Sequence, residues 1–195
     1  MEKLLIASNN MKKIEEFQAI LQDFPIKMYS LKDFDDKEDV EENGKTFHEN
    51  ALIKASHFAN KYNILTISDD SGLEVEALNN MPGIHSKRYS NNGDLANNLK
   101  ILQEMTNLNN RKARFRTVLC LYNPNGEIHY FEGILTGEIA YTAKGEGGFG
   151  YDPIFLIKEY NKTLAELGSN YKNKISHRAK ALFKFKEFMD ENINN

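Results

Sequence analysis

The residues best suited to chemistry are two adjacent acids in the stretch Asp69-Asp70-Ser71-Gly72, which follows an apolar run. Carboxylates at strand ends in α/β sheets often face a ligand crevice. A hard cation such as Mg²⁺ takes oxygen ligands, typically one or two carboxylates plus substrate phosphates. A second acidic pair, Glu41-Glu42, could add a ligand. Because Asp, Ser and Gly also favour turns, the stretch predicts either a cation site or an ordinary turn between two strands.

Three further stretches contain donors suited to phosphate groups. Ser8-Asn9-Asn10-Met11-Lys12-Lys13 opens a helical pattern, and a helix N-terminus presents unpaired N–H groups and a positive dipole end. It lacks the glycines of a P-loop. The loop 82–89 contains a serine, a lysine and an arginine, and the stretch 172–178 places Ser-His-Arg at a helix start. Taken singly, each also fits a capped helix or a solvated loop.

The stretch 145–155 has four glycines in six positions, followed by two aromatic residues and an aspartate. Glycine permits a positive φ and close approach of a ligand to the backbone. Aromatic faces beside such a backbone suit a flat ring, and an aspartate can accept ring N–H groups. The alternative is a turn-rich loop held on the core by its aromatic residues, with Pro153 to Phe155 as its attachment.

Periodicity predicts the elements that position these residues. Helices are expected after Asn10, after Thr46, around Leu95 to Leu102 and from about Ser176. Asn123-Pro124-Asn125-Gly126 predicts a hairpin. Strands are expected at 4–7, 64–68, 73–78, 114–122, 128–135 and 138–142, with an acidic loop at 33–43. Strands that alternate with helices and then form a meander predict an α/β fold with a mixed sheet.

Composition limits the classes of function. The 195 residues suit one domain, or one domain with two lobes, and 41% are hydrophobic. The net charge of -3 argues against a large nonspecific nucleic-acid footprint. Cys120, the single cysteine, lies in an apolar run and is expected in the core. No run approaches the ~18 apolar residues of a membrane span, and no signal peptide is evident, so the cytoplasm is expected.

Together these residues resemble the inosine/xanthosine triphosphate pyrophosphatases, which remove deaminated purine nucleotides. The resemblance covers the whole chain, 1–195, as a single domain. The matching stretches, in the family's order, are Ser8 to Lys13, Thr46 to Ala55, Asp69 to Leu73, Pro82 to Tyr89, Gly147 to Phe155 and Ile175 to Arg178.

The resemblance implies an elongated, two-lobed α/β fold around a mixed sheet flanked by helices, usually a homodimer. It implies hydrolysis of ITP, dITP or XTP to the monophosphate and pyrophosphate, with one Mg²⁺ per subunit. Whether Mn²⁺ can replace Mg²⁺ stays open. No nucleic-acid or membrane partner is implied.

The resemblance also implies roles for individual residues. Asp70 matches the general base and, with Glu42, the metal ligands. His177 and Arg178 are expected to donate to a 6-oxo group and so disfavour adenine. Lys54, Asp69 and Arg88 are further candidates. The implied substrate contacts are Ser8, Asn9, Asn10, Met11, Lys12, Lys13, Ser71, Phe149, Gly150, Tyr151, Asp152, Lys172, His177 and Arg178.

Three alternatives stay open at this point. The first is the related group of pyrophosphatases that act on modified pyrimidine nucleotides. The second is a nucleotide sensor that binds without turnover. The third is a small RNA-binding module that uses the basic stretch 172–178, against which the acidic net charge speaks.

Overall fold

The computed structural model describes residues 3–193, which divide into two compact units. The first comprises the described residues of Met1–Asp70, Thr117–Gly133 and Arg178–Asn195, and the second comprises Ser71–Arg116 and Ile134–His177. The expectation that both units form a single domain stays a prediction.

The first unit contains the parallel part of the sheet. Strand β1 (Lys3–Ile6) pairs in parallel with β2 (Lys27–Ser30) on one side and with β3 (Leu65–Val75) on the other. Next to β3 come β5 (Lys112–Tyr122) and β6 (Ile128–Ile139), which a hairpin turn at Asn123–Gly126 connects as expected. Strands β3, β5 and β6 continue into the second unit.

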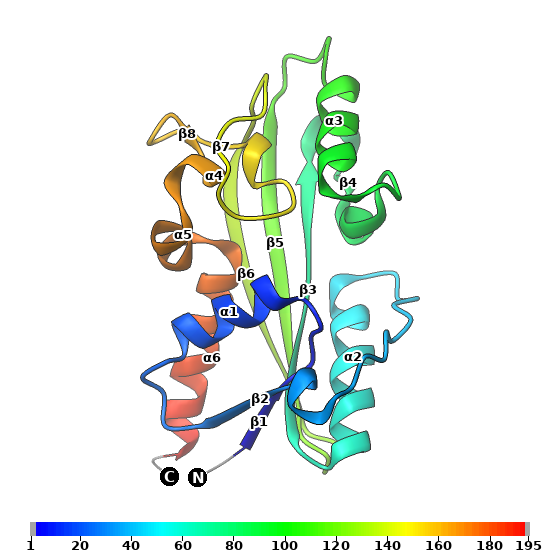
Figure 1. The fold of residues 1–195 in the computed structure, drawn as a ribbon, viewed down its shortest axis with the longest axis vertical. Helices are drawn as coiled ribbons and strands as arrows, with labels where there is room; N and C mark the ends of the chain where they lie inside the picture. The colour runs from blue at the N-terminus through cyan, green and yellow to red at the C-terminus, as the bar shows by residue number, and fades with distance from the viewer. Residues whose placement is uncertain (1–2, 194–195) are drawn as a thin grey trace. The chain divides into compact units, whose positions relative to one another are not determined.

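Alternation along β1 assigns its side chains to two cores. Leu4 and Ile6 join the core formed with α1 (Met11–Ile20) and α6 (His177–Ile193). Leu5 and Ala7 point the other way and pack with Phe58 of α2 (Phe47–Tyr62). This is the period of two that a strand imposes. Helices α1 and α6 therefore lie on one face of this part of the sheet, and α2 lies on the other (Figure 1).

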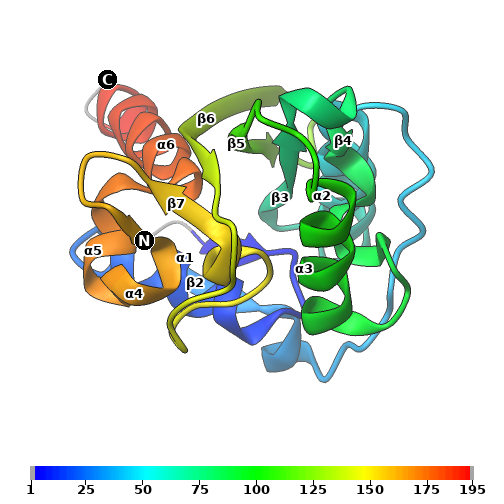
Figure 2. The same cartoon turned by 90° about the horizontal axis from the view of Figure 1, so that it is seen from above.

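The second unit contains the antiparallel additions. Strand β4 (Met81–Pro82) pairs with β3, β7 (Phe155–Ile157) pairs with β6, and β8 (Lys162–Thr163) pairs with β7. Its helices are α3 (Gly93–Glu104), α4 (Leu164–Leu167) and α5 (Ser169–Ile175), the last two adjacent in Figure 2. The short 3₁₀ helices of the chain are η1 (Leu31–Phe34), η2 (Glu76–Leu78), η3 (Gly83–Arg88) and η4 (Asp152–Ile154).

The predicted mixed α/β fold is confirmed, but the predicted turn at Asp69–Gly72 is wrong. These residues lie inside the continuous strand β3. Gly72 is required there by close approach, because a Cβ would lie 2.2 Å from the carbonyl oxygen of Gly83. Of the two acids in this stretch, Asp69 is compensated by cations from distant parts of the chain, described below.

Other differences also have local causes. The predicted break between 135 and 138 is absent, because Gly137 lies within β6 and leaves space for the ring of Phe155. Helix α3 is confirmed, yet it turns Asn97 and Asn98 inward and exposes Leu95 and Leu99. Periodicity did not predict β2, β7, β8, α4 or α5, which are short. Among residues 3–193, no helix combines the length and apolar character that a membrane span requires.

Candidate active site

The N-terminus of α1 is built by local capping. The Asn10 side chain accepts hydrogen bonds from the amides of Lys12 (3.1 Å) and Lys13 (3.3 Å), and the Asn10 amide donates to Ser8 Oγ. This is the N-cap that the Ser8-Asn9-Asn10 stretch predicted. The cap fixes the direction in which α1 leaves β1, and it places Lys13 at the third helical position.

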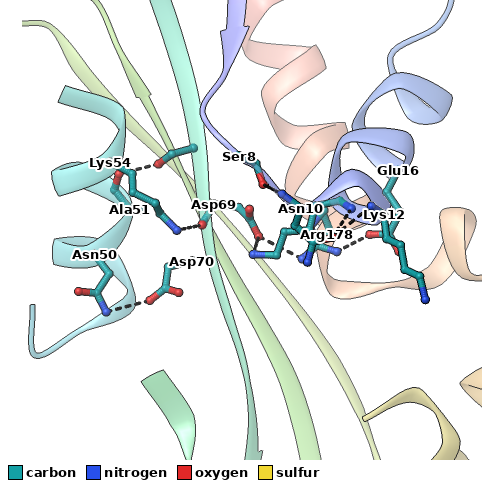
Figure 3. Close-up of polar contacts among 12 residues, drawn as sticks. Ser8, Asn10, Lys12, Glu16, Asn50, Ala51, Lys54, Asp69, Asp70 and Arg178 are labelled. Atoms are coloured by element: carbon teal, nitrogen blue, oxygen red, sulfur yellow. Dashed lines mark hydrogen bonds and ion pairs between the residues drawn. The ribbon is translucent and has the colours of Figure 1, made fainter. Parts of the chain in front are cut away.

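Asp69 is a buried carboxylate that receives two cations. Its Oδ2 lies 2.9 Å from Lys13 Nζ and 3.0 Å from Arg178 Nη2, and the second guanidinium nitrogen of Arg178 bonds Glu16 (Figure 3). Burial alone would raise the pKa of Asp69, but Lys13, Arg178 and Lys54 hold it well below its usual value. Asp69 is therefore ionised at neutral pH. Lys13 is also buried, and its burial lowers its own pKa.

The pKa of Asp70 is shifted in the opposite direction. Its side chain is also buried, and burial, together with the charge of Glu42, raises its pKa to about 6 against the opposing effects of Lys54, Lys13 and Asn50. Asn50 Nδ2 donates to Asp70 Oδ2 at 3.1 Å. A carboxylate with a pKa near neutrality is suited to accept a proton at physiological pH.

Glu42 and Lys54 form the next contact. Lys54 Nζ lies 2.6 Å from Glu42 Oε1. It also donates to the backbone oxygen of Asp69 at 2.6 Å (Figure 3). Burial would lower the pKa of Lys54, but Asp69, Glu42 and Asp70 raise it. The ammonium group thus lies among three acidic residues of the first unit.

The carboxylates of Glu42 and Asp70 fit a hard cation whose remaining ligands come from the substrate. Among the residues that the structure describes, no group of three or more His, Cys, Asp or Glu side chains could hold a metal ion by itself. Glu42 and Asp70 nevertheless interact electrostatically, and their oxygens are the ligand type that Mg²⁺ prefers. Mg²⁺ is commonly bound by one or two carboxylates together with phosphate oxygens, so these two residues fit it in that way only.

In the second unit, the glycine loop closes on Asp152. Asp152 Oδ2 accepts hydrogen bonds from the amide of Phe149 (2.9 Å) and from Lys172 Nζ (2.6 Å). Lys172 Nζ also lies 4.1 Å from the centre of the Phe149 ring. Gly148 has a φ of +74°, and a Cβ there would lie 2.0 Å from Asp152 Oδ2. The loop therefore requires glycine at this position so that the carboxylate can fold back beneath it.

The rest of the loop is attached to neighbouring elements. The Gly150 amide donates to Asp94 at 2.8 Å, and Asn98 of α3 donates to the Gly150 carbonyl at 3.0 Å. Tyr151 is buried in the core, and its hydroxyl donates to the Ser86 carbonyl. Ile154 and Phe155 are fully buried, so the expected attachment of the loop to the core is confirmed.

The remaining predicted residues are more dispersed. His177 is buried and stacks on Phe115 with ring centroids 4.7 Å apart. Ser71 is half-buried, Arg88 ends η3 on the surface, and Asn9 donates to the Glu38 carbonyl. The first unit brings together Lys13, Glu42, Lys54, Asp69, Asp70 and Arg178, and the second unit brings together Phe149, Asp152 and Lys172.

Two polar residues of the first unit were missed from the sequence. Glu16 accepts from Arg178, and Asn50 donates to Asp70. The available signal was a polar residue on the apolar face of a helix, since Asn50 shares the buried face of α2 with Phe47, Ala51 and Ala55. The proposed donation of Arg178 to a base stays a prediction, and the structure places its guanidinium between Glu16 and Asp69.

Comparison with known proteins gives a consistent result. Residues 4–188 match the model of the Ham1 family. A dITP/XTP pyrophosphatase of Acholeplasma laidlawii is 46% identical over 98% of this chain and 95% of its own length. One from Geobacter sulfurreducens is 45% identical over 97% of both chains.

Solved structures agree with this result. The Ham1 protein of Staphylococcus aureus has a TM-score of 0.88 at 41% identity, and the match covers 98% of this chain and all of that one. A HAM1 protein from Coxiella burnetii has a TM-score of 0.90 at 39% identity over the same shares. On its sequence and its fold, this chain belongs to the Ham1 family.

Proposed function

We propose that this protein is a nucleoside triphosphate pyrophosphatase that hydrolyses ITP, dITP and XTP to the monophosphate and pyrophosphate. The relatives from Acholeplasma laidlawii and Geobacter sulfurreducens are dITP/XTP pyrophosphatases that match nearly the full chain. The observation on which the proposal rests is the pair Asp69-Asp70, neighbouring carboxylates of which one is held ionised and the other is poised to take a proton.

In this proposal the first unit binds the triphosphate. The α1 N-terminus presents backbone N–H groups, which favour anions. Lys13 supplies a full positive charge beside them. Offsetting the charge that develops on phosphate oxygens is most of what a protein contributes to phosphoryl transfer.

Glu42 and Asp70 are the proposed Mg²⁺ ligands, with Mn²⁺ as a substitute. When bound, the cation would neutralise phosphate charge. Lys54 is paired with Glu42 and would compete with a cation for that carboxylate, so we expect its ammonium to turn toward phosphate oxygens when a metal binds.

In the chemical step, Asp70 is the proposed general base. Asp70 takes one proton from a water molecule, and the water oxygen forms a bond to the α-phosphorus. The bond between the α-phosphorus and its bridging oxygen breaks, and pyrophosphate leaves with the electron pair. General base catalysis of this kind contributes ~10²–10⁴-fold to a rate.

The proposal also names residues that would bind the purine ring. Phe149 is the proposed stacking residue, and Lys172 and Asp152 fix the backbone of the loop that presents it. His177 and Arg178 remain the proposed donors that favour a 6-oxo purine. We further propose that the protein is cytoplasmic and that it is a homodimer. Size-exclusion chromatography with light scattering would test the dimer.

The decisive experiment is incubation of the protein with ITP and Mg²⁺, followed by product identification. IMP with pyrophosphate is the expected result. IDP with orthophosphate would mean a different phosphatase, and tight ITP binding without turnover would mean a sensor. Faster turnover of modified pyrimidine nucleotides than of ITP would assign the chain to the related pyrophosphatase group.

Substitution of the general base, Asp70, tests the mechanism. Asp70→Asn is expected to lower kcat by at least ~10²-fold at saturating Mg²⁺. Asp23→Asn makes the same change at an exposed carboxylate and should leave kcat unchanged. Normal turnover by Asp70→Asn would remove Asp70 from the chemical step.

A further inference from the structure

Asn50 connects two backbone segments of the first unit through a single side chain. Its Oδ1 accepts a hydrogen bond from the amide of Gly44 at 2.8 Å. Its Nδ2 donates to Asp70 Oδ2 at 3.1 Å (Figure 3). The residue is 2% exposed and projects from the first turn of α2. One amide therefore contacts both the strand that bears Asp70 and the segment that bears Glu42.

The orientation of this amide is determined by its partners. A backbone N–H is a donor only, so the amide oxygen must face Gly44. The NH₂ group then faces Asp70, and the bond it donates favours the carboxylate form of Asp70. Gly44 lies close enough for this contact because it has no side chain: a Cβ there would lie 2.6 Å from Asn50 Oδ1.

The Gly44 contact also restrains Glu42, two residues earlier in the chain. Glu42 has a second attachment to α2, because its carboxylate pairs with Lys54 one helical turn beyond Asn50. The segment that bears Glu42 is thus attached to α2 at its backbone by Asn50 and at its side chain by Lys54. Of these two residues, Asn50 is the one that donates a hydrogen bond to the Asp70 side chain, whereas Lys54 acts on Asp70 through its charge.

We propose that Asn50 is a positioning residue that sets the geometry of Glu42 relative to Asp70. The inference rests on the proposed function, since these two carboxylates are the proposed metal ligands. Partners that orient metal-binding carboxylates typically change metal affinity or activity by ~10–100-fold when they are removed. A helix-packing role alone would change stability and leave those quantities alone.

Two variants separate the two hydrogen bonds. Asn50→Leu is similar in volume and removes both. Asn50→Asp keeps an acceptor for the Gly44 amide but replaces the donor to Asp70 with an oxygen. If Asn50 positions both carboxylates, Asn50→Leu raises the Mg²⁺ half-saturation and lowers kcat by ~10–100-fold, with little change in KM for ITP at saturating Mg²⁺. Asn50→Asp lowers kcat similarly at saturating Mg²⁺.

Asn97 provides a matched control in the second unit. It is equally buried at 2% exposure, accepts from the Ser90 amide and donates to the carbonyl of Ser86. Asn97→Leu should lower the melting temperature as much as Asn50→Leu does while leaving the Mg²⁺ half-saturation unchanged. If Asn50→Leu, Asn97→Leu and the wild type have the same Mg²⁺ half-saturation, the proposal is overturned. If Asn50→Asp keeps the wild-type kcat, the hydrogen bond to Asp70 has no part in positioning.

A readout without catalysis covers variants with poor activity. Mn²⁺ binding in the presence of a non-hydrolysable ITP analogue, followed by electron paramagnetic resonance, should weaken ~10–100-fold in Asn50→Leu. Amide hydrogen exchange at Gly44 should be slow in the wild type and in Asn50→Asp, and fast in Asn50→Leu. Fast exchange in the wild type would contradict the bridge.

The two hypotheses fail differently. A wild type that binds Mn²⁺ but makes no IMP or pyrophosphate from ITP would disprove the function and leave the positioning role intact. An active wild type whose Asn50→Leu variant keeps normal metal binding would disprove the positioning role alone.

Discussion

Asp69 and Asp70 are adjacent in one strand, yet their surroundings drive their pKa values in opposite directions. Alternate residues of a strand face opposite sides of the sheet, so neighbouring side chains meet different elements. Asp69 meets Lys13 and Arg178, whereas Asp70 meets the amide of Asn50. The difference between an ionised structural carboxylate and a poised base is therefore made by what each side of the sheet supplies.

The raised pKa of Asp70 makes a stability prediction. Since the folded value of about 6 exceeds the ordinary 3.8, Asp70 favours folding fully below pH 4, and this contribution is lost as pH rises through 6. Asp70→Asn lacks the titration. Relative to wild type in EDTA, its free energy of unfolding should rise between pH 4 and pH 8 by at most about 3 kcal/mol.

Urea unfolding at pH 4, 6 and 8 would measure this change. Asp23→Asn, at an exposed position, should show no such trend. A stability difference between Asp70→Asn and wild type that is equal at pH 4 and pH 8 would show that the carboxylate is not destabilised by burial.

The sequence predicted the identity of these carboxylates better than their setting. Asp-Asp-Ser-Gly is a turn composition, yet these residues lie within β3, and the cations that pair with Asp69 are far away in the chain, at Lys13 and Arg178. Local patterns contain no information on such partners. Asn50 was missed for a related reason, because a buried amide on a helix looks like any other residue of the packed face.

At the scale of elements, α2 holds the acidic segment that precedes it. Asp36 accepts hydrogen bonds from Lys61 Nζ (2.7 Å) and from the Tyr62 hydroxyl (2.5 Å), which lower its pKa to about 2. Glu38 also pairs with Lys61, at 2.8 Å, and with His57, at 3.0 Å. The C-terminal half of α2 thereby contacts the start of the segment whose end bears Glu42.

We expect Lys61→Met to loosen this segment. Exposed ion pairs contribute little to stability, so the free energy of unfolding should change by less than ~1 kcal/mol. The Mg²⁺ half-saturation should rise several-fold, because Glu42 loses part of its restraint, while kcat at saturating Mg²⁺ is retained. Lys158→Met, which breaks an exposed pair with Glu138 in the second unit, should change neither. Unaltered Mg²⁺ dependence in Lys61→Met would contradict the restraint.

The glycine loop makes a second prediction at this scale. Gly148→Ala combines a positive φ with a methyl group 2.0 Å from Asp152 Oδ2, so the loop must move. Gly126→Ala has positive φ but open space, and it should cost only the ~1–2 kcal/mol of left-handed strain. Gly148→Ala should destabilise the protein more and raise KM for ITP. Equal effects on the melting temperature would show that the contact with Asp152 does not constrain the loop.

At the scale of the molecule, each unit is assembled from segments that are distant in the chain. The core of the first unit combines β1, α1, the β5–β6 hairpin and α6. Local signals sufficed for the hairpin and the capped helices because turn and cap residues act on their own neighbours. They did not suffice for the short strands β7 and β8, which pair with β6 and with β7, respectively.

The contribution of α6 to the core of the first unit can be tested with two phenylalanines of this helix. Phe185 is fully buried and packs against Phe24 and Phe131, whereas Phe183 is 41% exposed. Phe185→Ala should lower the free energy of unfolding by about 3–5 kcal/mol. Phe183→Ala should lower it by less than ~1 kcal/mol. Denaturant titration measures both, and similar losses would place α6 outside the core.

Cys120 gives the protein an internal reporter. It is the single thiol of the chain, it is fully buried in β5, and burial raises its pKa to about 12. The thiolate is the reactive form, so alkylating reagents can react with Cys120 only when the first unit opens and exposes it. The rate of covalent labelling at neutral pH therefore reports on opening of that unit. Comparing this rate with and without nucleotide would measure protection by the ligand without any engineered probe.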